Sequence, residues 1–127
     1  MKFVVFGLTI SSSWGNGHAT LWRGLCSALG NRGHRVIFYE RDVHYYASTR
    51  DYGEIAGCQL RLYSAWEAIT ASAGAELNGA DVAIVTSYCP DGIAATRLVL
   101  DSPVRWKTFY NLLRSGYPRY AGQAEDG

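Results

Sequence analysis

The residues best suited to chemistry stand together near the start of the chain, at residues 11–18. The stretch reads Ser11, Ser12, Ser13, Trp14, Gly15, Asn16, Gly17 and His18. Its hydroxyl groups can bind a ligand, and the backbone of its glycines can approach one closely. A helix is expected to begin at its end, and unpaired N–H groups at a helix N-terminus favour an anion. The stretch therefore predicts a loop that binds a phosphate or a sugar hydroxyl.

The same stretch has a second interpretation. A turn rich in glycine, serine and asparagine is also the ordinary connection from a strand into a helix, with Ser13 or Asn16 as the helix cap. The dinucleotide-binding fingerprint is not present, because Thr20 stands in the place of its third glycine and the preceding loop is too long. The motif alone leaves both a binding loop and a plain connector open.

The elements on either side of this loop follow from hydrophobic periodicity. Residues 2–8 form a nearly unbroken apolar run, which is typical of a strand buried on both faces. Residues 18–29 change to a helical period, and Leu21, Leu25 and Leu29 are predicted to cover the sheet. Truncation of Leu25 to alanine is accordingly expected to cost about 2–5 kcal/mol of stability. A second strand at residues 35–39 completes a right-handed βαβ unit with parallel strands.

Further strands are expected at residues 58–63, 81–86 and 104–110, and further helices at 65–77 and 93–100. This alternation predicts an α/β fold: a Rossmann-like doubly wound parallel sheet of about five strands, with helices on both faces. The most plausible spatial order is three-two-one-four-five, with the third strand at an edge. The residues expected to be buried in the sheet are Val4, Val5, Ile37, Phe38, Ile84 and Val85.

Polar residues follow three of these strands, where parallel strands place them at one edge of the sheet. Arg41 and Asp42 follow the second strand, together with Glu40, and Tyr46 and Arg50 stand on a short helical stretch beyond them. Asp91, taken alone, is favoured as the cap of the next helix. The shared location nevertheless predicts one concave surface formed by Ser11, Ser12, Ser13, Asn16, Gly17, His18, Arg41, Asp42, Ser87 and Asp91.

Composition narrows the class of protein. The chain of 127 residues is expected to form one domain, residues 1–110, followed by an irregular tail at 111–127. A net charge of +1 gives no support for a nucleic-acid surface or an acidic partner. Three scattered cysteines, Cys26, Cys58 and Cys89, are expected to be reduced thiols of a cytoplasmic protein. No membrane span, metal site or cofactor is predicted.

Several segments together resemble a known family. The segment at residues 6–20, with the turn Gly15-Asn16-Gly17-His18, and the later Arg32-Gly33-His34-Arg35-Val36 are similar to the opening βαβ unit of GT-B glycosyltransferases. With Tyr39-Glu40-Arg41-Asp42-Val43 and Pro90-Asp91-Gly92, they resemble the N-terminal domain of bacterial CgeB-like glycosyltransferases. The resemblance covers Met1 to about Tyr110. Residues 111–115 depart from it, because an acidic segment follows the fifth strand in that family.

The resemblance implies a function and roles for the residues. Enzymes with this fold bind a sugar acceptor mainly on the first domain and a nucleotide-sugar donor mainly on the second. This chain would therefore be the acceptor-binding half of a glycosyltransferase, truncated and inactive alone. The candidate catalytic bases are His18, Asp91 and Asp42. The candidate substrate-binding residues are Ser11, Ser12, Ser13, Gly15, Asn16, Gly17, Arg41, Tyr46, Arg50 and Ser87.

Other classes of function remain open from the residues. The alternative is a free-standing flavodoxin-like module, in which the serine loop would hold the phosphate of a flavin mononucleotide. A phosphoryl-receiver domain is weaker, because such a domain has carboxylates after the first strand and this chain has hydroxyls there. A fold remnant that binds nothing is the fourth possibility. The sequence does not define the donor, the acceptor or the stereochemical outcome.

Overall fold

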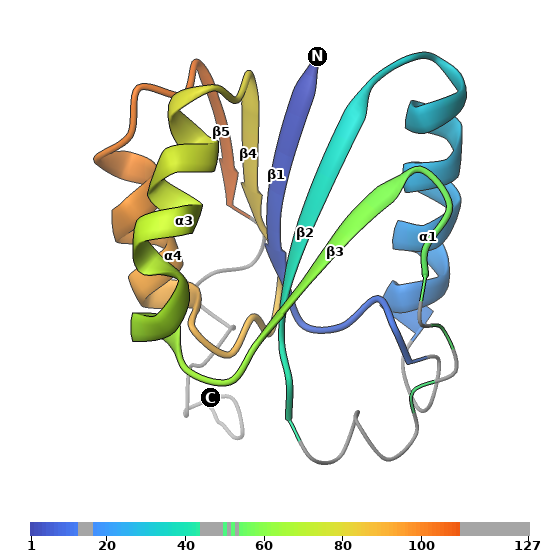
Figure 1. Cartoon of the computed structure of the whole chain (residues 1–127), viewed down its shortest axis with the longest axis horizontal. Helices are drawn as coiled ribbons and strands as arrows, with labels where there is room; N and C mark the ends of the chain where they lie inside the picture. Colours follow the sequence, from blue (N-terminus) through green and yellow to red (C-terminus); the bar gives the residue numbers. More distant parts are fainter. Residues whose placement is uncertain (13–16, 44–49, 51, 53, 110–127) are drawn as a thin grey trace, which may run out of the picture.

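The computed structural model describes residues 1–12, 17–43, 50, 52 and 54–109, and its centre is a five-stranded sheet. All neighbouring strands are parallel, in the order β3-β2-β1-β4-β5 (Figure 1). The predicted fold class and strand order are therefore confirmed. The strands are β1 (Lys2–Gly7), β2 (Arg35–Arg41), β3 (Cys58–Tyr63), β4 (Val82–Val85) and β5 (Trp106–Phe109).

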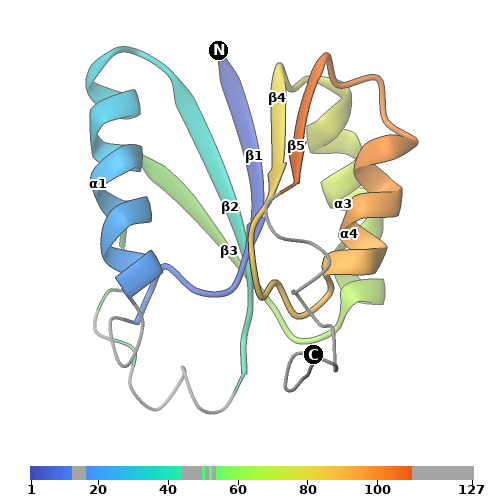
Figure 2. The same cartoon turned by 180° about the vertical axis from the view of Figure 1, so that it is seen from behind.

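Helices cover both faces of this sheet. They are α1 (Gly17–Asn31), α3 (Trp66–Asn78) and α4 (Gly92–Leu100). Helix α1 lies on one face, and α3 and α4 lie together on the other (Figures 1 and 2). The right-handed crossover rule explains the arrangement, because the chain steps from β1 to β2 in one direction and from β3 through β4 to β5 in the other.

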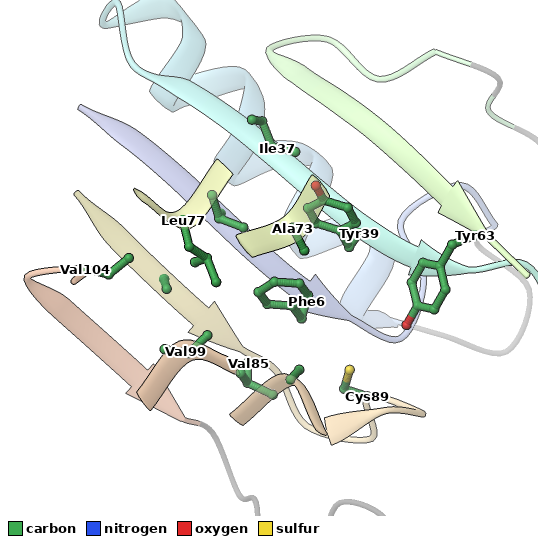
Figure 3. Close-up of a cluster of buried hydrophobic side chains, with 13 residues drawn as sticks. Phe6, Ile37, Tyr39, Tyr63, Ala73, Leu77, Val85, Cys89, Val99 and Val104 are labelled. Atoms are coloured by element: carbon green, nitrogen blue, oxygen red, sulfur yellow. The ribbon is translucent and has the colours of Figure 1, made fainter. Parts of the chain in front are cut away.

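The larger part of the core lies beneath α3 and α4. Phe6 and Tyr39 stack there with ring centroids 5.2 Å apart, and Leu77 of α3 is fully buried in the same cluster. Val99 brings α4 onto the same face (Figure 3). Trp66, Ile69 and Ala73 contribute from α3, as its apolar face predicts. Figure 3 also shows Tyr63 and Cys89 at the end of this cluster where the strands terminate.

The face beneath α1 corrects one prediction. Leu21 is 74% exposed and Leu25 is 45% exposed, so neither covers the sheet. Positions that recur every fourth residue drift around a helix of 3.6 residues per turn, whereas steps of three and four alternate along one side. The side facing the sheet consists of Ala19, Trp22, Cys26 and Leu29.

The other predicted core positions agree with the structure except for one. Val4, Val5, Ile37, Phe38 and Val85 are buried. Ile84 is only partly buried, because it lies on the α1 face of β4, and that helix lies over β2 and β3 rather than over β4 (Figure 2). Strand β3 is an edge strand, as expected from its alternating pattern. Within the described part of the chain, no helix has the length and apolarity to cross a membrane.

Candidate functional site

The candidate site lies where the parallel strands end, at the lower edge of the sheet in Figure 1. The segments that follow β1, β2 and β4 all begin at this edge, because parallel strands share one carboxyl end. Two groups of polar side chains occupy it. The Glu40 cluster consists of Ser11, Glu40, Asp42 and Arg50, and the Asp91 cluster consists of Arg41, Tyr63 and Asp91.

Glu40 ties the segment after β1 to the end of β2. Its side chain is fully buried, and one carboxylate oxygen accepts hydrogen bonds from the N–H groups of Ile10, at 2.8 Å, and Ser11, at 3.1 Å. The other oxygen accepts a bond of 2.7 Å from the Ser11 hydroxyl. A buried carboxylate is tolerated only when its oxygens are hydrogen-bonded in this way.

Arg50 completes the Glu40 cluster. Its Nε donates to Ser11 Oγ at 2.8 Å, and its Nη2 donates to Asp42 Oδ1 at 3.0 Å. The same nitrogen lies 3.5 Å from Glu40 Oε2, so the guanidinium compensates the buried charge. The structure therefore brings together Ser11, Asp42 and Arg50, three of the predicted site residues. These contacts hold the loop in place, however, because the Ser11 hydroxyl donates to Glu40 and accepts from Arg50.

This arrangement changes what the loop after β1 offers to a ligand. The N–H groups of Ile10 and Ser11 already donate to Glu40, and the carboxylate places a negative charge among them. A phosphate at this point would find these donors already engaged by a carboxylate that Arg50 compensates. The described part of the predicted loop is thus poorly suited to an anion, which the sequence motif did not indicate.

The Asp91 cluster forms between three separate elements. Arg41 Nη1, at the end of β2, lies 3.1 and 3.4 Å from the two Asp91 carboxylate oxygens. The hydroxyl of Tyr63, at the end of β3, donates to Asp91 Oδ2 at 2.8 Å. Asp91 occupies the N-cap position of α4, but its side chain makes no capping bond. The capping role favoured from sequence is therefore wrong, because a guanidinium and a phenol bind the carboxylate instead.

Burial controls the protonation of the groups around Asp91. Burial, followed by the hydrogen bond to Asp91, raises the pKa of Tyr63 well above its ordinary value, so the phenol stays a donor. Burial also raises the pKa of the neighbouring Cys89 thiol to about 12. Cys89 is therefore a neutral thiol beneath the site and not a nucleophile.

His18 stands at the exposed start of α1, on the other side of this edge. Its ring meets the ring of Tyr88 at a centroid distance of 6.3 Å, and Tyr88 belongs to the loop between β4 and α4 that also carries Asp91. Tyr88 has φ of 60°, a left-handed conformation that is costly for a bulky residue and recurs at binding sites. His18 and Asp91 therefore flank one loop at one end of the domain.

A pocket adjoins the Asp91 cluster at the first turn of α4. Its volume is about 340 Å³, and Asp91 is the predicted site residue in its lining. Ile93 and Arg97 form its outer wall, and Ile93 is 61% exposed. The pocket thus combines a carboxylate, a guanidinium and apolar surface at the edge predicted for a binding site.

The remaining predicted residues divide into two groups. Ser12 and Ser87 are buried at this edge, and Gly17 is the first residue of α1. Ser13, Gly15, Asn16 and Tyr46 lie outside the described residues. Sequence reasoning did not include Glu40 or Tyr63 in the site, although each stands at the end of its strand. Arg41 was chosen because it stands at the end of a strand, and the same criterion would have included Glu40 and Tyr63.

No metal site is apparent within the described ranges, where no three histidine, cysteine or acidic side chains are grouped to hold an ion. Comparison of the chain with protein-family models, with curated proteins and with solved structures gives no match. The residues at the carboxyl edge are therefore the basis for a proposed function.

Proposed function

We propose that this chain is the acceptor-binding half of a nucleotide-sugar-dependent glycosyltransferase. The observation that carries the proposal is the Asp91 cluster, with His18 on the other side of the loop that holds Asp91. Arg41 and Asp91 come from two of the segments that resemble CgeB-like glycosyltransferases. They are 50 positions apart in sequence and in direct contact in the structure.

The chemistry of the cluster suits a hydroxylated acceptor. A carboxylate has about four lone-pair sites, so Asp91 retains acceptor capacity for a sugar hydroxyl after its contacts with Arg41 and Tyr63. These two donors also fix the orientation of the carboxylate. His18 is exposed and is the proposed base, which takes the proton of the acceptor hydroxyl as that oxygen attacks the anomeric carbon of the donor. Asp42 is less suited to this role, because it pairs with Arg50.

The donor half, on this proposal, is a second Rossmann-like domain. Glycosyl transfer from a nucleotide sugar requires stabilisation of a leaving diphosphate. At this edge the N–H groups of Ile10 and Ser11 are taken up by the carboxylate of Glu40. The isolated chain is therefore expected to bind an acceptor without turning over a donor.

The hydrogen bonds from Ile10 and Ser11 to Glu40 also reduce the support for a flavodoxin-like module. Of the donors that the phosphate of a flavin mononucleotide could use in the described part of the loop after β1, the N–H groups of Ile10 and Ser11 and the Ser11 hydroxyl bind Glu40 instead. The glycosyltransferase proposal has no such conflict, because a neutral sugar hydroxyl carries no charge to that edge.

The experiment that tests the proposal is a calorimetric titration of the folded chain with a panel of neutral oligosaccharides. Asp91→Asn should weaken the best binder about tenfold or more, because it removes a charged acceptor from the site. Asp101→Asn is the matched control, since Asp101 is exposed at the opposite end of α4. Equal loss of affinity in both variants, or full affinity in Asp91→Asn, would contradict the proposed site.

A further inference from the structure

We infer that Cys26 and Cys58 form a dithiol that can be oxidised reversibly to a disulfide. This modification site is separate from the residues proposed to bind a sugar acceptor. Cys26 lies on the sheet-facing side of α1 and is fully buried. Cys58 is the first residue of β3 and packs, half-buried, against the same cluster of side chains. The two residues are far apart in sequence and adjacent in the fold.

Gly30 and Gly57 allow the backbone of α1 and the backbone just before β3 to come into contact. A Cβ atom on Gly57 would overlap the carbonyl oxygen of Cys26, so only glycine fits between β3 and the helix. A Cβ atom on Gly30, one turn further along α1, would lie 2.8 Å from the Gly57 Cα. Cys58 directly follows Gly57 and packs against the cluster that contains Cys26, so the two side chains lie on neighbouring elements at this close contact. A disulfide needs the backbones of its two cysteines to approach closely, with Cα atoms about 4.4–6.8 Å apart.

The two thiols are also chemically unequal. Hydrogen bonding from the Cys58 thiol lowers the pKa of Cys26 despite its burial. The same interaction, together with burial, raises the pKa of Cys58 well above its ordinary value. The hydrogen bond between the two sulfurs thus favours one thiolate in the pair, which is the form that a peroxide oxidises.

The oxidant is a hydroperoxide. The Cys26 thiolate attacks one peroxide oxygen, the O–O bond breaks, and the departing oxygen takes a proton to leave as water or an alcohol. The sulfur of Cys58 then attacks the resulting Cys26 sulfenic acid. The S–O bond breaks as the S–S bond forms, and the Cys58 proton leaves with the oxygen as water. Overall, two thiols lose two electrons to the peroxide, and a dithiol reductant reverses the step.

Cys89 provides an internal comparison. It is buried in the other core cluster, beneath α3 and α4, on the opposite face of the sheet. Burial raises the pKa of its thiol to about 12, so it is a poor nucleophile. Oxidation of the native chain is therefore expected to spare Cys89.

The experiment uses the full chain, treated with hydrogen peroxide in its native state, alkylated in denaturant and mapped by peptide mass spectrometry. The expected result is the loss of two of three alkylatable thiols, with one cross-link joining the peptides of Cys26 and Cys58. Dithiothreitol should restore both. Oxidation in guanidinium is the control, and there cross-links should form without selectivity among the three cysteines, Cys89 included. Cys89→Ala should retain the native cross-link, and Cys58→Ser should lose it.

Retention of three alkylatable thiols after native oxidation would overturn the inference. A cross-link to Cys89, or oxidation of Cys26 and Cys58 to separate sulfinic acids, would also overturn it. The mapping of the wild-type chain decides the matter even if Cys58→Ser proves unstable. None of these results depends on saccharide binding, so failure here leaves the proposed function unaffected.

Discussion

Among the single glycines that the structure describes, Gly57 is the one least able to accept a side chain. Its φ of +77° is left-handed, and a Cβ atom would overlap the Cys26 carbonyl oxygen. Gly33 also has a left-handed φ, of +83°, but open space where a Cβ atom would lie. Comparing the two positions therefore separates the cost of backbone strain from the cost of steric overlap. Gly33→Ala should cost about 1–2 kcal/mol, from backbone strain alone. Gly57→Ala should cost several kcal/mol more, measured by urea unfolding, and equal effects would refute the close packing of β3 on α1.

Leucine positions test the revised orientation of the helices. Leu77 of α3 is fully buried, so Leu77→Ala should cost about 2–5 kcal/mol of unfolding free energy. Leu25 of α1 is 45% exposed, so Leu25→Ala should cost less than about 1 kcal/mol. Thermal unfolding of both variants is a direct comparison, because the substitution is the same. A larger cost at Leu25 would restore the stripe expected from sequence.

At the scale of elements, Glu76 joins α3 to two strands. Its carboxylate accepts from Lys2 Nζ at 2.6 Å and from Arg61 Nη2 at 3.2 Å. The hydrogen bond from Lys2 is the main cause that lowers the pKa of Glu76 below 4.5. A lowered pKa means that the folded state holds this proton less tightly than the unfolded state. The contribution to stability is therefore present above about pH 4.5 and is lost as the pH falls through the folded pKa.

Glu76→Gln should consequently lower the unfolding free energy by about 1 kcal/mol near neutral pH. The difference from wild type should shrink as the pH falls below about 4.5, where the wild-type carboxylate becomes protonated. Glu67→Gln, at an exposed position of the same helix, serves as the control. A deficit for Glu76→Gln that stays constant down to strongly acidic pH would rule out the ion pairs as its source.

The elements were largely predictable, because period and turn residues are local properties of the sequence. The left-handed Gly33 at the end of α1 is an example, since a glycine there is a common helix stop. The side of α1 that faces the sheet was not predictable from leucine spacing. It depends on small residues, Cys26 and Gly30, that permit close approach of the backbone of Gly57, and such long-range contacts leave no periodic signal.

At the scale of the whole molecule, topology explains why the site residues converge. Strand order brings the ends of β1, β2 and β4 to one edge, so the sequence could predict that the residues after these strands lie at that edge. The pairing of side chains could not be predicted in this way. A sequence shows that Glu40, Arg41 and Asp42 are charged, but only the fold turns Glu40 inward to Ser11 and Arg41 outward to Asp91.

Amide NMR titration of the isotopically labelled chain locates the acceptor site residue by residue. The probes are the best-binding neutral oligosaccharide and, separately, a nucleotide sugar. We expect oligosaccharide-induced shifts at His18, Arg41 and residues 87–92, with no comparable shifts from the nucleotide sugar. Oligosaccharide shifts confined to the opposite edge of the sheet, or nucleotide-sugar shifts centred on Ser11 and Glu40, would contradict this expectation.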